Sequence, residues 1–258
     1  MFEFKPTEIK HIKHLRISYF YEIKLSQELF LEWMIREAEA FKIYNDNHEV
    51  GYFIVNKEGI LLEFYLITEI LYKKEEIFKQ LIENHSVKKI YCKSFDNVLL
   101  TCSHTFCTSN KVIGTLFRDY SKGISVEYEN QFKVRLARHS DIQFLLAYDS
   151  GLYESPEELR YTVANNMLYM FEKDNYLIGC GYLIKIMPDK NFHDIGVWTN
   201  PDVRKQGYGA MIISYLKRHC FSHNYTPVCG CDVNNIASRK TLERNGFISK
   251  YCLIEFNL

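Results

Sequence analysis

Two glycines at the start of an apolar segment give this sequence its clearest chemical signal. Gly207 and Gly209 follow a β-like run, residues 194–199, and precede a helix-periodic run, residues 211–219. Glycine lets the backbone approach a ligand closely, and the first turn of a helix has N–H groups without intrahelical acceptors and a partial positive charge. This strand–turn–helix pattern predicts a site for a pyrophosphate.

The spacing of the motif narrows the ligand. The loop lacks the Gly-x4-Gly-Lys-Ser/Thr spacing of a P-loop and the third glycine of a dinucleotide fingerprint. It reads instead as Arg-x-x-Gly-x-Gly, beginning at Arg204. Taken alone, this short pattern also fits a plain strand-to-helix turn.

A second motif follows one helix and one strand later. Asn235 precedes a short helix-like run and can cap it, and Ser238 follows three residues after that asparagine. Gly246 comes after the last turn of this run, where a positive φ ends a helix, and Phe247 returns the chain to the core. The strand before this helix is expected over residues 227–233.

The two motifs, in this order and spacing, resemble the GNAT superfamily of N-acetyltransferases. The resemblance covers residues 132–258, with a first strand and the start of a first helix over 132–142, Ser140 or Asp141 as the helix cap, and a hairpin strand over 175–184. Residues 199–201 and 235–238 look most like the zwittermicin-resistance branch. The resemblance implies acetyl-CoA as co-substrate, bound through the backbone or side chains of Val197, Trp198, Thr199, Arg204, Lys205, Gln206, Gly207, Tyr208, Gly209, Ala210, Asn235 and Ser238.

The first half of the chain repeats the order of elements in the second half. Residues 49–55 parallel residues 178–184, with Gly51-Tyr52 where the second copy has Gly181-Tyr182. Strands are expected over 60–66, 89–93 and 112–117, and helices over 75–84 and 97–107. An unrelated α+β cap domain is the alternative interpretation.

The first copy lacks the glycine loop. No glycine occurs between Gly59 and Gly114, so the backbone cannot easily wrap a pyrophosphate there. We therefore expect an α/β (α+β) protein of two tandem GNAT-like domains, each a mixed, mostly antiparallel sheet flanked by helices. The first, residues 1–122, lacks the CoA pyrophosphate loop, and the second, residues 131–258, carries it; residues 121–130 form the linker.

Composition argues against several classes of partner. Lysine plus arginine number 32 and aspartate plus glutamate also number 32, which disfavours general electrostatic binding to nucleic acid or to an anionic membrane. The N-terminus has no signal-peptide pattern, so a cytoplasmic protein is expected. The eight cysteines read as buried thiols rather than disulfides or metal ligands. The expected partner is a small-molecule amine, and the chain is expected to be a monomer or homodimer.

Acetyl transfer to an amine needs a base to take the amine proton, and a proton for the departing thiolate. A carboxylate on the strand before the loop relays the amine proton in several members of the superfamily, which makes Asp194 the first candidate here. His193 lies on the opposite face of that strand by alternation, and Glu154 and Glu157 are candidates for recognising the amine. Many members carry a tyrosine where this chain has Leu242, so Tyr251 is the candidate acid.

The leading functional hypothesis is an N-acetyltransferase that moves an acetyl group from acetyl-CoA to the amine of a small molecule. A CoA-binding sensor or scaffold without turnover is an alternative, which Leu242 favours. A transferase that uses aminoacyl-tRNA is a further alternative, against which the neutral charge and the complete CoA loop both count.

Overall fold

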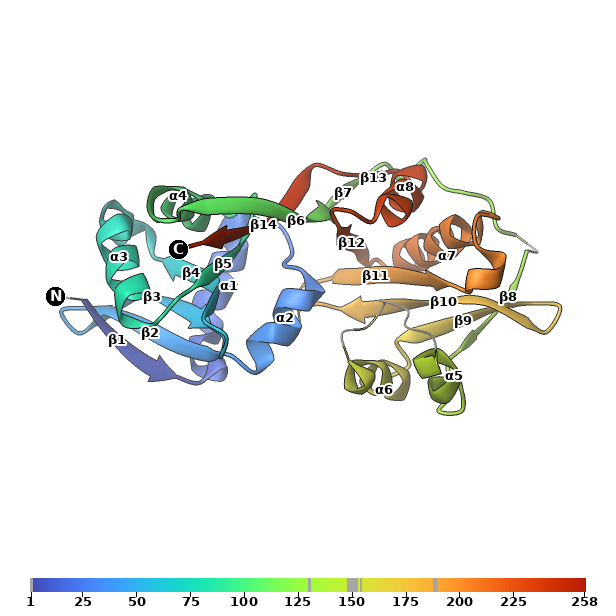
Figure 1. The fold of residues 1–258 in the computed structure, drawn as a ribbon, viewed down its shortest axis with the longest axis horizontal. Helices are drawn as coiled ribbons and strands as arrows, with labels where there is room; N and C mark the ends of the chain where they lie inside the picture. Colours follow the sequence, from blue (N-terminus) through green and yellow to red (C-terminus); the bar gives the residue numbers. More distant parts are fainter. Residues whose placement is uncertain (1, 130, 148–152, 154, 188–189) are drawn as a thin grey trace. The chain divides into compact units, whose positions relative to one another are not determined.

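The chain forms two compact units in the computed structural model, which describes residues 2–129, 131–147, 153, 155–187 and 190–258. The first unit comprises residues 1–116 together with 251–258, and the second comprises residues 117–250. Each unit is a mixed, largely antiparallel sheet with helices against it (Figure 1). No helix in the described part of the chain is long and apolar enough to cross a membrane.

The sheet of the first unit has the strand order β1-β2-β3-β4-β5-β14-β6. Its strands are β1 (Phe2–Thr7), β2 (Glu39–Asn45), β3 (His48–Val55), β4 (Ile60–Leu66), β5 (Lys89–Lys93), β6 (Ser109–Phe117) and β14 (Tyr251–Asn257). Its helical segments are η1 (Ile9–Ile12), α1 (Lys13–Ile23), α2 (Leu29–Arg36), η2 (Thr68–Lys73), α3 (Lys74–Asn84) and α4 (Asn97–Phe106).

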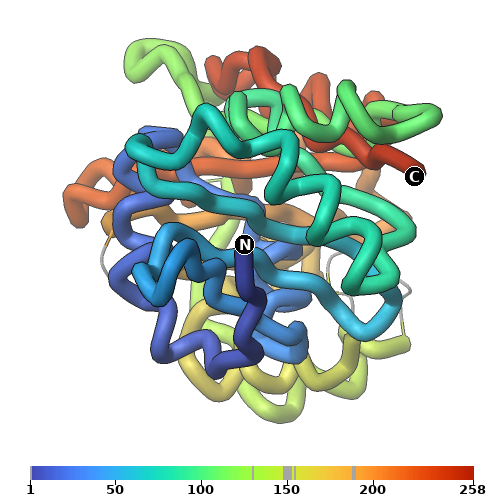
Figure 2. The backbone as a smooth tube through the Cα atoms, turned by 90° about the vertical axis from the view of Figure 1, so that its left-hand side faces the viewer, coloured from blue at the N-terminus to red at the C-terminus, as the bar shows by residue number. Residues whose placement is uncertain are grey.

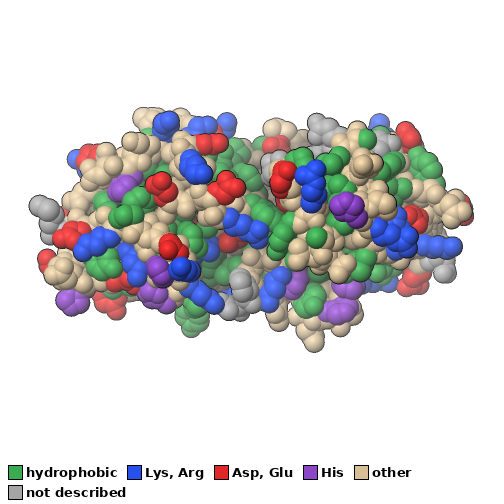
Figure 3. All heavy atoms as spheres, turned by 90° about the horizontal axis from the view of Figure 1, so that it is seen from below, with side chains coloured by type: hydrophobic (Ala, Val, Ile, Leu, Met, Phe, Trp, Pro, Cys, Tyr) green, Lys and Arg blue, Asp and Glu red, His purple; other side chains and the backbone are tan. Residues whose placement is uncertain are grey.

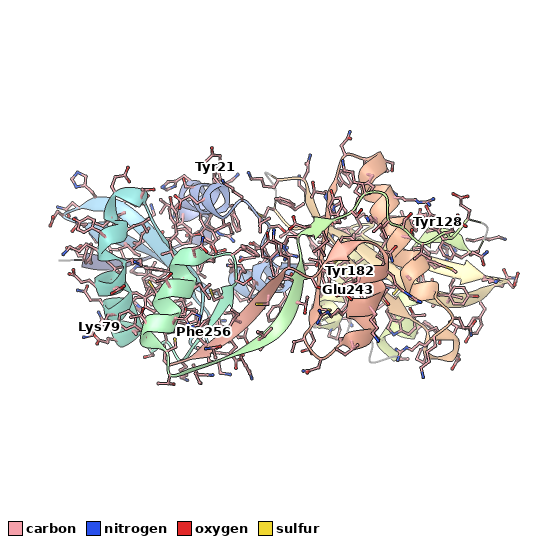
Figure 4. The ribbon with its side chains drawn as sticks, turned by 90° about the horizontal axis from the view of Figure 1, so that it is seen from above. Tyr21, Lys79, Tyr128, Tyr182, Glu243 and Phe256 are labelled. Carbon is pink, nitrogen blue, oxygen red and sulfur yellow. The ribbon has the colours of Figure 1, made fainter. Side chains whose placement is uncertain are left out.

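The C-terminal strand β14 completes the sheet of the first unit. It pairs antiparallel with β5 on one side, where Leu253 lies opposite Lys93, and with β6 on the other, where Tyr251 lies opposite Leu116. Figure 2 shows the C-terminal segment beside the segments that carry β6 and α4, and Figure 4 labels Phe256, a buried residue of this strand. The compact unit therefore differs from the expected division at residues 122 and 131, because the last strand finds its hydrogen-bond partners in β5 and β6.

The sheet of the second unit has the order β12-β11-β10-β9-β8, and β7 and β13 form a separate pair. Its strands are β7 (Asp119–Tyr120), β8 (Lys133–Leu136), β9 (Leu168–Lys173), β10 (Tyr176–Lys185), β11 (Phe192–Thr199), β12 (Thr226–Asp232) and β13 (Phe247–Ile248). Its helical segments are α5 (Asp141–Ala147), α6 (Pro156–Ala164), η3 (Pro201–Val203), α7 (Tyr208–Ser222) and α8 (Ile236–Arg244).

Helices cover both faces of the second sheet. α5 and α6 lie on one face, and α7 and α8 on the other (Figure 1). The α7 side is packed by apolar residues that include Ile195, Ile212 and Leu216, and the α5–α6 side by residues that include Trp198 and Leu159. Side chains of β11 alternate between these two cores, as a strand buried on both faces requires.

A buried lysine joins three backbone segments of the second unit. Lys217 on α7 is 1% exposed, and its Nζ donates to the carbonyls of Ser121, Ile124 and Asn245 at 2.5–3.0 Å. The aromatic rings around it include Phe247 of β13. Lys217 thus holds the segment after β7 next to the segment before β13, where the two short strands pair.

The sequence-based elements agree closely with the structure at β4 and β5, whose bounds were expected residue for residue. The expected fold class, two tandem domains of this mixed type, is confirmed. The helix after Gly207 is longer than expected, because the apolar periodicity begins at Met211 but the backbone is already helical at Tyr208. The N-terminal strands and helices before residue 48 were not predicted.

Candidate functional site

Two neighbouring strands of the second sheet, β11 and β12, separate part-way along their length. β11 and β12 pair in parallel only over Phe192–Asp194 and Thr226–Val228. Beyond the Asp194–Val228 pair, β11 continues to Thr199 paired with β10. The edge of β11 that faces β12 therefore carries backbone N–H and C=O groups that the β11–β12 ladder does not use, from residue 195 onward.

The glycine loop begins where this open stretch of β11 ends. Gly207 is the residue before α7 and has φ +89°, which a glycine adopts without strain. Lys205 also has a positive φ, +65°. A Cβ added to Gly209 would lie 3.1 Å from Oγ1 of Thr199, so the helix start approaches the end of β11 closely. Gly207 is thus favoured by its positive φ, and Gly209 by the short distance between the helix start and Thr199.

The start of α7 exposes N–H donors. The first helical hydrogen bonds run from the amides of Ala210 and Met211 to the carbonyl of Gly207, at 3.0 and 3.2 Å. The amides of Tyr208 and Gly209 precede these bonds, and helix geometry gives them no intrahelical acceptor. Gly207 has no side chain to cap them. A helix of this length with an uncapped N-terminus favours an anion at that point.

The remaining expected cofactor residues lie around this loop. The Arg204 side chain donates from Nε to the carbonyl of Thr199 at 3.2 Å, which places its positive charge at the end of β11. Asn235 caps α8, because its side-chain oxygen accepts the amide of Ser238 at 3.0 Å. The Trp198 side chain is 3% exposed and packs on the α5–α6 side, so only its backbone faces the open edge.

A hollow of about 570 Å³ lies on the outer surface of α8. It is lined by Ala237, Lys240, Thr241, Glu243 and Arg244. Thr241 links this hollow to the loop, because its methyl group would lie 3.8 Å from a Cβ at Gly209. Basic and hydrogen-bonding side chains thus continue the polar surface that starts at the loop.

Asp194 occupies the point at which the strands part. It is 5% exposed, belongs to the last β11–β12 pair, and accepts a hydrogen bond from the Tyr182 hydroxyl at 3.2 Å. His193 lies on the opposite face, as alternation predicts, and stacks on Tyr225 with ring centroids 3.9 Å apart. This stacking leaves His193 only 6% exposed.

The other candidates for acid or base belong to other elements of the fold. Leu242 is 3% exposed in the core under α7, so an apolar side chain fills that position. Tyr251 begins β14 in the first unit, and its ring packs edge-on against Phe95 at 5.4 Å. Glu157 is exposed and pairs with Arg160 at 3.0 Å. Glu154 lies outside the described residues.

The first unit has the same strand register at the position that corresponds to Asp194, but with other side chains around it. Tyr52 lies opposite Tyr65 and Ile54 opposite Glu63, as Tyr182 lies opposite Gly196 and Ile184 opposite Asp194. Glu63 is thus the counterpart of Asp194. β4 and β5 also pair only briefly, at Ile60–Lys89 and Leu61–Ile90, before β4 continues paired with β3.

Charged side chains fill the space beside Glu63. Glu63 is fully buried and receives Nε and Nη2 of Arg16 at 3.0 and 2.7 Å, together with the Tyr52 hydroxyl at 2.8 Å. Gln27, from the segment between α1 and α2, donates to Glu63 at 2.7 Å and accepts from the buried Lys93 of β5 at 2.7 Å. This network joins β4 to β5 through side chains, where the second unit has its open edge.

The network keeps Glu63 ionised despite its burial. Burial alone would raise the pKa of Glu63, but the Arg16 guanidinium and its hydrogen bonds outweigh that effect and hold the pKa below its ordinary value. Its contribution to stability is therefore present above the ordinary pKa of a glutamate, and it is lost as the pH falls through the lowered value of the folded state.

Comparison with known families agrees with this duplicated geometry. Residues 8–120 match the model of an acetyltransferase (GNAT) domain, and residues 134–247 match that of the acetyltransferase (GNAT) family. The chain is a tandem GNAT protein. A search of the curated proteins found no sequence match.

Several solved structures share the fold of this tandem GNAT protein. A GNAT-family acetyltransferase from Colwellia psychrerythraea is 18% identical with a TM-score of 0.89, over 99% of each chain. A tandem GNAT protein from the clavulanic acid biosynthesis pathway is 9% identical with a TM-score of 0.60, over 100% of this chain and 98% of the other. A GCN5-related N-acetyltransferase from Sphaerobacter thermophilus is 11% identical with a TM-score of 0.64, over 98% and 95%.

Two substitutions at Gly207 test whether the loop binds an anion, because their side chains have the same shape and differ only in charge. Asparagine and aspartate have the same size and both tolerate a positive φ better than other residues do. We expect Gly207→Asp to weaken acetyl-CoA binding by about tenfold or more relative to Gly207→Asn, because like charges repel at short range. Isothermal titration calorimetry measures both affinities.

Gly123 supplies the control for that pair, since a Cβ added there would meet no atom within 4 Å. Gly123→Asp should bind acetyl-CoA as the unmodified protein does. Equal affinities for the aspartate and asparagine variants at Gly207 would contradict an anion site in this loop.

The buried network of the first GNAT unit predicts a large loss of stability when its central charge is removed. Glu63→Gln leaves the Arg16 and Lys93 cations with less compensation, and breaking a buried ion pair costs roughly 3–5 kcal/mol. Urea unfolding followed by circular dichroism measures this change. Glu83→Gln is the matched control, because Glu83 pairs with Lys79 only at the surface, at 3.9 Å; an equal effect of the two substitutions would refute the account.

Proposed function

We propose that this protein is an N-acetyltransferase that moves an acetyl group from acetyl-CoA to the amine of a small molecule. The observation that carries the proposal is that Asp194 belongs to the last pair of β11 and β12, at the vertex of the V that these two strands form as they part. From there the open edge of β11 leads to the glycine loop at the other end of the same strand. A donor bound at the loop and an acceptor bound at Asp194 would meet along one strand edge.

The length of the open edge suits an extended acyl carrier. Asp194 and Thr199 are five residues apart on β11, which corresponds to about 17 Å at roughly 3.3 Å per residue. Backbone groups of Val197, Trp198 and Thr199 would hold the pantetheine arm, and amides from Gln206 to Ala210 would take the pyrophosphate. The exposed Lys205 and the Arg204 side chain add positive charge there, while Asn235 and Ser238 at the start of α8 would border the arm.

Asp194 would act as the base. An aliphatic amine is mostly protonated at neutral pH, so its lone pair becomes available only after a proton leaves. In the proposed step, Asp194 accepts that proton, and the amine nitrogen forms a bond to the thioester carbonyl carbon. The nitrogen then loses its second proton to solvent as the carbon–sulfur bond breaks, and the sulfur leaves as the CoA thiolate, which receives a proton from an acid. Glu157 is kept as a site of amine recognition rather than proton transfer.

The departing thiolate needs a proton donor. Leu242 has no proton to give, and Tyr251 is proposed as the donor from β14. A thiolate leaves more readily than an alkoxide, so transfer without a protein acid is compatible with the site.

The first unit supports the choice of a cationic acceptor. Glu63, at the register of Asp194, binds the Arg16 guanidinium while it also accepts the hydroxyl of Tyr52. A tyrosine–carboxylate pair at this position of the fold can thus hold a positively charged nitrogen. In the second unit, we propose that the ammonium group of the acceptor takes the corresponding place.

The acceptor class proposed here includes amine-bearing antibiotics of the kind handled by the zwittermicin-resistance branch. We also propose a cytoplasmic protein that is a monomer or homodimer and does not act on nucleic acid or membranes. The face shown in Figure 3 supports the latter, because Lys and Arg side chains are interspersed with Asp and Glu side chains across it.

A CoA-binding sensor without turnover is the second candidate, and the apolar Leu242 favours it. Release of free thiol from acetyl-CoA in the presence of a panel of amines separates the two candidates. Thiol release with any amine of the panel supports the transferase. Tight CoA binding with no thiol release across the whole panel supports the sensor.

The proposed base makes a specific kinetic prediction. Asp194→Asn keeps the shape and most hydrogen bonding of the side chain, but an amide cannot accept the amine proton. We expect acetyl-CoA binding to be retained and kcat near neutral pH to fall by roughly 10²-fold or more. The loss should shrink at high pH, where the amine is already deprotonated.

Glu157→Gln serves as the control for Asp194→Asn, because Glu157 is an exposed carboxylate on α6. It should change KM for the amine but leave the pH dependence of kcat as it is. A wild-type rate for Asp194→Asn at neutral pH would show that another group is the base.

A further inference from the structure

Tyr182 approaches Asp194 from the neighbouring strand. Its hydroxyl donates to Oδ2 of Asp194 at 3.2 Å, and its ring is half-buried on the α5–α6 side of the sheet. Figure 4 labels Tyr182 in the second unit. The ring of Tyr153 lies near it, with centroids 6.2 Å apart. Neither the loop nor the start of α8 takes part in this contact.

A glycine makes this approach possible. Gly196 lies directly opposite Tyr182 in the β10–β11 pair, and a Cβ built on Gly196 would overlap the Tyr182 ring. The ring therefore lies across β11 over a residue without a side chain. Asp194 is two residues before Gly196 and so lies on the same face, which places its carboxylate next to the phenol oxygen.

The same pair occurs in the first unit without that glycine. The Tyr52 hydroxyl donates to Oε2 of Glu63 at 2.8 Å, from the same register position. The residue opposite Tyr52 is Tyr65, so no ring lies over a bare backbone there. The hydroxyl–carboxylate contact is thus common to both units, while the glycine under the ring is particular to the second.

Two explanations of Tyr182 make different predictions. An aromatic ring over a cross-strand glycine stabilises a sheet by packing alone, and the hydroxyl would then be incidental. A hydrogen bond from the hydroxyl instead favours the ionised carboxylate and fixes its plane. The recurrence of the hydroxyl contact at Glu63, where no glycine lies under the ring, favours the second explanation.

We propose that Tyr182 is a positioning residue for Asp194, and that Gly196 is required because it lets the ring reach across β11. The hydroxyl holds Oδ2, orients the carboxylate towards the vertex of β11 and β12, and keeps it ionised and ready to accept a proton. This inference rests on the proposed role of Asp194 as base. His193 does not share the task, since it faces α7 and stacks on Tyr225.

The direct test measures the titration of Asp194 without any acceptor. Protein labelled with ¹³C at aspartate carboxyls is titrated by NMR, and Asp194→Asn identifies the signal. In Tyr182→Phe, the ring and its packing remain and only the hydroxyl is lost. The titration midpoint of Asp194 should move upward by roughly half to one pH unit, because the lost hydrogen bond favours the ionised form of the carboxylate.

Two further variants make the test decisive. Gly196→Ala displaces the ring while keeping the hydroxyl, and it should move the midpoint in the same direction. Tyr52→Phe removes the same group from the first unit, and it should leave the Asp194 midpoint unchanged. If Tyr182→Phe and Tyr52→Phe lower the melting temperature but neither moves the midpoint, Tyr182 is a packing residue and the proposal is overturned.

Kinetics with the amine panel test the transferase activity, while the NMR midpoints test the effect of Tyr182 on Asp194. Where an acceptor is found, the acidic limb of kcat/KM should move upward with the NMR midpoint in Tyr182→Phe, and KM for acetyl-CoA should not change. An acidic limb that stays in place while the NMR midpoint moves would overturn the role in proton transfer. Failure of every amine would refute the transferase proposal, while the NMR midpoints would still decide whether Tyr182 controls Asp194.

Discussion

The separation of β11 from β12 after the Asp194–Val228 pair is the constraint on which the rest of the second unit depends. A strand edge inside a sheet is normally satisfied by its neighbour, so an open one needs another partner. Here the open edge runs from the buried carboxylate of Asp194 at one end to the uncapped N-terminus of α7 at the other. Because α7 packs against β10 and β11, it holds that N-terminus at the end of the strand. The fold thereby aligns a place for an anion with a place for a proton acceptor.

The first unit shows what the same scaffold does when that opening is filled from within. Glu63 and Lys93, on strands that also part early, are joined through Gln27, and Arg16 neutralises the carboxylate. Buried charges cost free energy unless each finds a partner, and this network provides one for each. With no glycine loop at the following turn, the first unit fills the gap between its strands with charged side chains of its own. At this position the two similar units therefore differ in a few polar residues rather than in topology.

Much of the second unit was predictable because its signals are local. The positive φ of Gly246 and the cap at Asn235 follow from residue types at fixed spacing, and the structure confirms both of them. Three features were not predictable. The place of β14 between β5 and β6, the three carbonyls around Lys217 and the partner of Glu63 all depend on residues far away in the sequence. Periodicity identifies a strand or a buried position, but it does not name the partner.

Hydrogen–deuterium exchange with and without acetyl-CoA tests the central claim most directly, because it reports on backbone amides in both units at once. We expect slower exchange on binding along the open edge of β11 and in the loop up to Ala210. We expect no change in β4, η2 or the start of α3, the corresponding elements of the first unit. Protection of those first-unit elements, or binding that leaves the amides of the glycine loop unprotected, would contradict that claim.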